Sequence, residues 1–310
     1  MGAIIKACNV VSGVKNTGKE CDTAMVATAM LIAIHRSVKF TAEQLSGDPV
    51  EWLDDLIHQR KAFPLFGQQA PIRTITNSSE SDVLVTLDDG LQVFLRYGIY
   101  NRTFETTSGG LCYADALQSL NKSGYSIIEI DQQGQMLARR NSDGTFSGFI
   151  VDFMYAPSPI LADFKNTPYK NRFQISFSPV EMVNNGIIFQ GAEELLSMMG
   201  LIDVVMTASS AATTTKLKLN VKTHCAEASL VELFPAEIDQ VSNFVVENTA
   251  SLGTPVSITA GAVVGKTVEL TGTFTSGQTY RVKGSSPSVW KSNGITGYDA
   301  SGSFVDILIP

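Results

Sequence analysis

Apolar and polar residues alternate along four short runs in the last third of the chain, between about Phe244 and Pro310. The runs are Pro255–Thr259, Lys266–Thr271, Gln278–Val282 and Ser303–Ile309. Alternation with a period of two is typical of strands that bury one face, and Gly, Ser and Thr clusters between the runs are typical of turns. The pattern predicts a small β-module at residues 240–310.

Residues 1–239 are predicted to form a larger, β-rich core, because apolar runs bounded by turn signals recur along them. The expected strands are residues 24–35, 82–87, 91–97, 99–106, 125–131, 135–140, 145–155, 172–178, 203–207 and 216–222. The length of the first run, 24–35, also allows a buried helix, and we favour the strand. Asp88-Asp89-Gly90 is a hairpin signal, since Gly supplies the positive φ of the turn. We assign the hairpin of 203–207 and 216–222 to the core, which places the domain boundary between residues 223 and 243.

Two longer helices are expected beside the strands. Asp48 is suited to cap a helix that runs to about Lys61, with Pro49 at its first position. A second helix is expected to start at Gly109-Gly110 and end at Gly124, with a buried face of Leu111, Ala114, Leu117 and Leu120. The predicted fold class is mainly β with a few helices (α+β). A chain ending near Val241 is expected to stay soluble.

Composition narrows the classes of function. A formal net charge of -7, with scattered basic residues, argues against a nucleic-acid-binding surface. Four cysteines lie far apart at Cys8, Cys21, Cys112 and Cys225, and we expect free thiols. The N-terminus lacks the pattern of a signal peptide, and the longest apolar stretch is too short to span a bilayer. These features predict a soluble cytoplasmic product without a membrane partner.

One segment comes close to a phosphate-binding loop. Gly13–Lys19 matches the pattern G-x-x-x-x-G-K, but Glu20 occupies the position where Ser or Thr would bind magnesium. A carboxylate there faces the phosphates and repels them. We therefore expect a polar connection and no nucleotide site.

The other candidate groups do not assemble into a recognisable catalytic or metal site. The three histidines are His35, His58 and His224, and only His224 has a neighbouring cysteine, Cys225. Adjacent carboxylates, such as Asp88 and Asp89, point in different directions on a hairpin and make poor acid–base pairs. We expect no catalytic residue, no cofactor and no metal.

The segment Pro157–Asn171 contains three prolines and four large apolar residues in a long irregular stretch. The apolar residues are Ile160, Leu161, Phe164 and Tyr169. A long loop has to bury such groups, either on its own domain or against a neighbouring subunit. We interpret these four residues as a candidate subunit interface, and the alternative of a loop packed on its own domain stays open.

With core and module together, the layout resembles the tail-tube (major tail) proteins of long-tailed bacteriophages. The segments that carry the resemblance are Asn16–Cys21, Ser108–Cys112, Gly144–Phe149 and Gly297–Ser303. The resemblance implies a structural virion subunit, made in the host cytoplasm, that forms stacked hexameric rings with other virion proteins. It also implies an immunoglobulin-like fold for the C-terminal module, a lumen through which DNA passes without specific binding, and no catalytic residue.

Two alternatives remain beside the tail-tube hypothesis. In the first alternative, the chain is another phage virion protein, such as a head, decoration or connector protein. In the second, it is a glycan-binding protein or an enzyme with an accessory β-module. A hollow filament would select the tail tube, and a monomer that binds a glycan or a nucleotide would select the last class.

Overall fold

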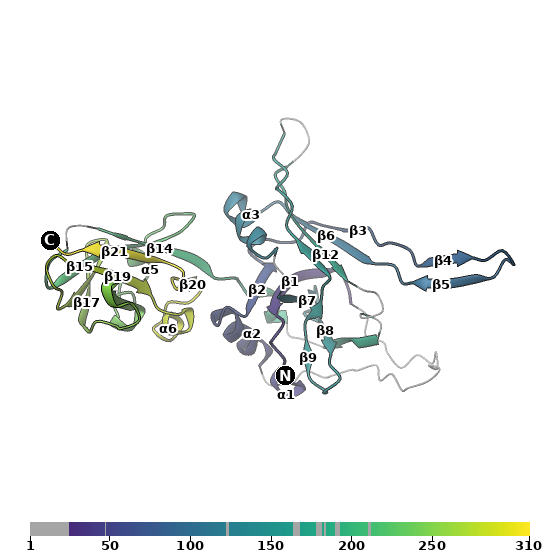
Figure 1. The fold of residues 1–310 in the computed structure, drawn as a ribbon, viewed down its shortest axis with the longest axis horizontal. Coiled ribbons are helices and arrows are strands. Elements are labelled where there is room, and N and C mark those ends of the chain that lie inside the picture. Colours follow the sequence, from purple (N-terminus) through teal and green to yellow (C-terminus); the bar gives the residue numbers. More distant parts are fainter. Residues whose placement is uncertain are drawn as a thin grey trace. The chain divides into compact units, whose positions relative to one another are not determined.

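The computed structural model describes residues 25–46, 48–121, 124–163, 168–177, 182, 184–189, 193–209 and 212–310. The chain divides into two compact units, Met1–Met199 and Gly200–Pro310 (Figure 1). The division falls well before the expected domain boundary near residue 240. The boundary moves because the hairpin at residues 203–223 pairs with a strand of the second unit. The near-miss phosphate-binding loop, Gly13–Lys19, lies outside the described residues.

The first unit is built around two antiparallel sheets. Its strands are β1 (Thr28–His35), β2 (Ala62–Phe66), β3 (Thr74–Asn77), β4 (Val83–Thr86), β5 (Gln92–Arg96), β6 (Tyr100–Thr106), β7 (Tyr125–Asp131), β8 (Met136–Arg140), β9 (Phe146–Ser147), β10 (Phe149–Ile150), β11 (Phe153–Tyr155), β12 (Asn171–Phe177) and β13 (Gly186–Phe189). One sheet has the order β13-β8-β7-β1-β2, with β10 beside β7 and β9 beside β8. The other has the order β11-β12-β6-β3, and β4 pairs with β5 alone.

The expected strand at residues 145–155 is broken into three short strands. β9 pairs with β8, β10 with β7, and β11 with β12, so the chain passes from one sheet to the other here. Gly148 lies at the first break, and a Cβ there would come within 2.6 Å of the Ser126 hydroxyl oxygen. Close backbone approach explains why this position is Gly.

These sheets are accompanied by the helices α1 (Ala42–Ser46), α2 (Pro49–His58) and α3 (Gly110–Ser119) and by the 3-10 helix η1 (Glu193–Ser197). Asp48 caps α2 as expected, because its side chain accepts hydrogen bonds from the backbone N–H of Val50 and Glu51. α3 buries Ala114 and Leu117 but leaves Leu111 67% exposed, which corrects the predicted apolar face. It also ends at Ser119, before the expected stop at Gly124.

A buried ion pair connects the two sheets of the first unit. Arg102 on β6 contacts both carboxylate oxygens of Glu129 on β7, and the Thr28 hydroxyl donates to Glu129 at 2.8 Å. The side chains of Glu129 and Arg102 are only 5% and 17% exposed. A charge removed from water needs such a partner, so the pair fixes how the sheets face each other.

The second unit contains two further sheets around one apolar core. Its elements are β14 (Ile202–Ala208), β15 (Lys216–Thr223), α5 (Leu230–Leu233), η2 (Val241–Asn243), β16 (Phe244–Asn248), η3 (Thr249–Ser251), β17 (Ile258–Val264), β18 (Thr267–Gly272), β19 (Thr279–Gly284), α6 (Pro287–Ser292), β20 (Tyr298–Asp299) and β21 (Phe304–Leu308). The strand orders are β17-β18-β15-β14-β20 and β16-β19-β21. β14 and β20 are parallel.

The β14–β15 hairpin forms as predicted but belongs to this second unit. β15 pairs with β18, so that Leu217 lies opposite Leu270 and Leu219 opposite Val268. All four side chains are fully buried. A boundary at residue 240 would therefore cut through one sheet and one core, and the prediction that residues 1–239 form the core is wrong.

The predicted fold class is confirmed as mainly β with a few helices. The prediction of free thiols is wrong for Cys112 and Cys225, which are both disulfide-bonded. Cys8 and Cys21 lie outside the described residues. Of the expected strands in the C-terminal third, the one at Pro255–Thr259 is shifted, because β17 begins only at Ile258.

Candidate functional site

A long antiparallel hairpin extends from the sheet of the first unit. β3 and β6 pair within the sheet, and hydrogen bonds from Ser78 N to Asn101 O and from Glu80 N to Ile99 O, both 2.9 Å, continue the ladder outward. β4 and β5 then form the outer part, which we call the projecting hairpin (residues 83–97) (Figure 1). β3 and β6 are anchored in the four-stranded sheet, whereas β4 and β5 have no further strand beside them in the described residues.

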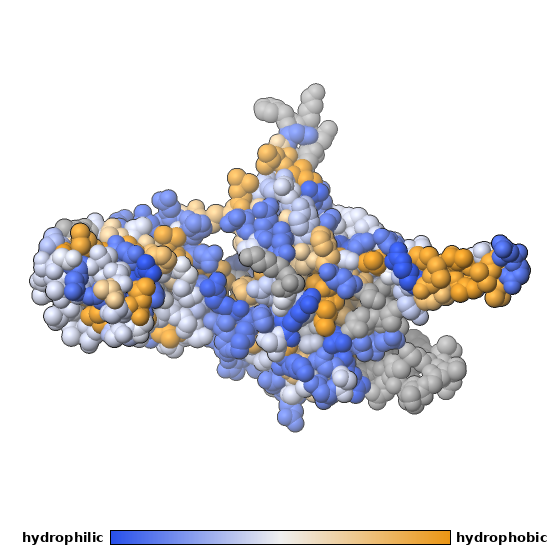
Figure 2. Space-filling view, in the orientation of Figure 1, coloured by the Kyte–Doolittle hydropathy of each residue, from blue (hydrophilic) through white to orange (hydrophobic). Residues whose placement is uncertain are grey.

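The projecting hairpin exposes an unusual amount of apolar surface. Because side chains alternate between the faces of a strand, the register defines two faces. One face carries Val85, Leu87, Leu91 and Val93, and the other carries Leu84 and Phe94. All six are exposed, as are Leu95 and Tyr97 nearby. Figure 2 shows this hydrophobic band, which ends in a hydrophilic tip.

The tip consists of Asp88, Asp89 and Gly90, the turn that the sequence predicted. Gly90 has a φ of 82°, and its N–H donates to Leu87 O at 2.8 Å. The Asp89 carboxylate accepts a hydrogen bond from Leu91 N at 2.9 Å. Both aspartates are exposed, so the tip presents two negative charges beyond an apolar stem.

Gly98 is expected to be essential for the junction between the sheet and the projecting hairpin. A Cβ at this position would lie 1.9 Å from the backbone oxygen of Glu80, and backbone cannot move aside as a flexible side chain can. Gly98→Ala should lower the free energy of unfolding by about 1–3 kcal/mol, the usual cost of overpacking. Thermal unfolding measures this, and Gly90→Ala serves as a comparison in which only the positive φ is strained.

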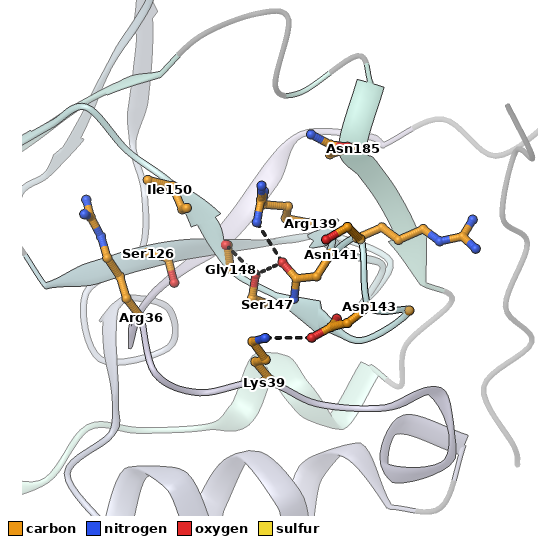
Figure 3. A pocket seen from close by; sticks show the side chains of 13 residues that line it. Arg36, Lys39, Ser126, Arg139, Asn141, Asp143, Ser147, Gly148, Ile150 and Asn185 are labelled. Carbon is orange, nitrogen blue, oxygen red and sulfur yellow. Dashed lines mark hydrogen bonds and ion pairs between the residues drawn. The ribbon is translucent and has the colours of Figure 1, made fainter. Parts of the chain in front are cut away.

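A basic hollow of about 720 Å³ lies elsewhere on the first unit (Figure 3). Its lining includes Arg36 and Lys39, which follow β1, and Arg139 and Arg140 from the end of β8. One acidic side chain, Asp143, belongs to the same lining. Among the lining residues that the structure describes, basic side chains outnumber acidic ones, which makes this an anion-attracting surface in a chain whose net charge is -7.

The residues of the basic hollow are held in place by hydrogen bonds from several elements. Arg36 donates to the backbone oxygens of Tyr125 and Val151 at 3.0 and 2.9 Å. Arg139 donates to the Asn141 side-chain oxygen at 2.7 Å. The turn from Asn141 to Thr145 carries the acidic residue and closes one side of the hollow.

Lys39 and Asp143 form an ion pair at the edge of the basic hollow, with 2.7 Å between Nζ and Oδ2. The hydrogen bond from Lys39, together with hydrogen bonds from Thr145, holds the pKa of the Asp143 carboxyl well below its usual range. The carboxylate therefore stays charged at any ordinary pH. It pairs with Lys39, so among the described lining residues Arg36 and Arg140 supply positive charge beyond this ion pair.

The residues predicted as a subunit interface lie on the loop between β11 and β12. Ile160 and Lys170 form a bridge with two backbone hydrogen bonds of 2.9 Å, so the base of the loop is closed. Leu161 is 68% exposed, whereas Ile160 and Tyr169 are half-buried and the Tyr169 hydroxyl donates to Asn171 at 3.0 Å. Phe164 lies outside the described residues. The interface assignment stays a prediction.

Two of the three histidines, His35 and His58, occupy separate places in the first unit. His35 lies exposed at the end of β1, with Nδ1 2.7 Å from the Ser37 hydroxyl oxygen, and His58 is buried on α2. Tyr113 on α3 is half-buried, and burial of its hydroxyl oxygen raises the pKa of that group. The structure gives two surfaces that sequence reasoning missed, the apolar faces of the hairpin and the basic hollow.

Comparison with models of known protein families and with curated proteins finds no match to this chain. Among the described residues, no helix combines the length and the apolar character needed to cross a membrane.

Proposed function

We propose that the protein is a structural subunit of a bacteriophage virion, a tail-tube protein whose copies associate into stacked rings. The projecting hairpin is the single observation that carries this proposal. A two-stranded hairpin is at best marginally stable in water, and this one exposes apolar side chains on both faces. Burying each Leu, Val or Phe against a neighbour contributes about 1.5–3 kcal/mol. Association with further copies is the simplest way to cover it.

The rest of the proposal follows from the resemblance of the sequence to tail-tube proteins of long-tailed bacteriophages. The rings are hexameric, other virion proteins contact the ends of the tube, and DNA passes through without specific binding. The chain is made in the host cytoplasm, has a structural and not a catalytic role, and needs neither cofactor nor membrane. The second unit is an immunoglobulin-like accessory domain, a proposal that its two sheets around one core support.

The loop at Pro157–Asn171 is the second contact surface in this proposal. Leu161 is the most exposed of its described apolar residues, and Ile160, Phe164 and Tyr169 complete the set. Prolines reduce the conformational entropy that such a loop loses when it orders on a partner.

The proposal predicts that the purified protein forms rings or hollow filaments. Leu91→Ser/Leu95→Ser should weaken this assembly at least tenfold in concentration and leave the monomer folded, because the two side chains are 60% and 59% exposed in the single chain. Loss of about 1.4 kcal/mol of contact energy is enough for a factor of ten. Light scattering after size exclusion, with negative-stain electron microscopy, measures the effect.

Leu252→Ser is the matched control, since Leu252 is similarly exposed, at 54%, but lies in the second unit. It should leave assembly unchanged. A wild-type protein that stays monomeric at high concentration, with no filaments at any salt concentration, would contradict the proposed function.

A further inference from the structure

The tip of the projecting hairpin and the basic hollow carry opposite charges on one chain. Asp88 and Asp89 place two carboxylates at the tip, and neither residue lines the hollow of its own chain. Arg36 and Arg140 line the hollow and supply positive charge beyond the Lys39–Asp143 pair. Figure 1 shows the hairpin extending away from the rest of its unit, so its tip is presented outward.

We infer that the basic hollow is the receptor for the hairpin tip of a second copy of this chain. The inference rests on the proposed self-assembly and specifies where the contact forms. The tip is narrow, because its turn holds only Asp88, Asp89 and Gly90, and the hollow has a volume of about 720 Å³. The aspartate carboxylates of one copy would accept hydrogen bonds from arginines of the next, the strong charge-assisted kind.

The hairpin and the hollow have separate roles in this contact. The apolar faces of the stem supply most of the affinity, since they lose their exposure to water. The charged tip sets the position and the orientation, because complementary charges select the correct register and disfavour others. Exposed ion pairs contribute little affinity individually, which is consistent with this division.

A contact of this kind does not end at a dimer. The tip and the hollow are different surfaces of the same chain, so each copy can give its tip to one neighbour and receive the tip of another. Such head-to-tail contacts close into a ring when the rotation permits, and otherwise continue as a filament. The inference therefore accounts for a ring or a single filament, and the loop at Pro157–Asn171 remains available as the second contact surface.

Reversal of the charges at each side tests the contact. Asp88→Lys/Asp89→Asn makes the tip positive and retains an acceptor for the Leu91 N–H. Lys39→Glu/Arg140→Glu gives the described lining of the hollow more acidic than basic side chains and changes only exposed residues. Each variant should raise the concentration needed for assembly about tenfold, as expected when like charges meet. The chain with all four substitutions should recover to within about threefold of the wild type, because opposite charges meet again.

Two charge reversals elsewhere on the first unit are controls: Asp115→Lys on α3 and Arg73→Glu, both at exposed positions. They should assemble as the wild type does. Circular dichroism and thermal unfolding confirm that every variant is folded. Assembly of the wild type should also weaken as salt rises, because salt screens charges at the surface.

The outcomes separate this inference from the proposed function. If the wild type assembles and the tip or hollow variants assemble equally well, or the combined variant is not restored, the inference is wrong and the tail-tube proposal stands. If the wild type does not assemble, both are wrong. If a labelled DNA oligonucleotide binds the wild type but not Lys39→Glu/Arg140→Glu, while Asp88→Lys/Asp89→Asn assembles normally, the hollow holds nucleic acid and the inference is overturned.

Discussion

A chain that ends at Val241 is expected to aggregate, whereas a chain that ends at Met199 is expected to stay soluble. The longer fragment keeps β14 and β15 but loses β18, which covers one edge of β15. Leu217 and Leu219, fully buried in the intact protein, then face water together with the rest of that sheet face. Each such side chain costs about 1.5–3 kcal/mol to expose, and a free sheet edge adds a template for aggregation.

Solubility after expression and binding of a dye specific for exposed apolar surface measure the difference between the two fragments. Limited proteolysis adds a local readout, since residues 200–241 should be cleaved first in the longer fragment. In the full chain, fluorescence of the fully buried Trp290 reports the intact second unit. Equal solubility of both fragments, without dye binding, would place the boundary later in the chain.

The error in the domain boundary has a physical cause. The alternation of Lys216–Thr223 identifies a strand, and the strand and its hairpin partner are both present. An alternating pattern indicates that one face of a strand is buried, but it does not indicate to which sheet the strand belongs. The strand that covers β15 on its other side, β18, begins only at Thr267, and no local signal connects the two.

The same limit explains why the two candidate surfaces were missed. Asp88-Asp89-Gly90 predicted the turn correctly, because turn type depends on a few adjacent residues. Whether other parts of the chain cover the flanking apolar residues depends on the whole fold. One available signal was the apolar character of both faces, since Leu84 and Val85 are adjacent, as are Phe94 and Leu95. The basic hollow joins Arg36 and Arg139 from distant segments, and only the pairing of β1 with β7 and of β7 with β8 brings them together.

The buried pair of Arg102 and Glu129 should carry the largest single-residue effect on the first unit. Arg102→Met leaves the carboxylate of Glu129, 5% exposed, without its positive partner. An unpaired buried charge costs about 3–5 kcal/mol in the free energy of unfolding. Arg102→Met/Glu129→Leu should recover most of that loss, because an apolar pair of similar size needs no compensation inside the protein. Lys39→Met breaks the exposed pair with Asp143 and should have little effect.

Denaturant unfolding followed by the fluorescence of Trp52 measures these differences. The chain has two tryptophans, and Trp52 on α2 belongs to the first unit while Trp290 belongs to the second. In a Trp290→Phe background, the signal therefore reports the first unit, which avoids treating a two-unit chain as one transition. A loss below about 1 kcal/mol for Arg102→Met, the range of exposed pairs, would mean that Glu129 reaches water in the variant. A combined variant no more stable than Arg102→Met would show that packing around the pair, and not its charge, holds the two sheets together.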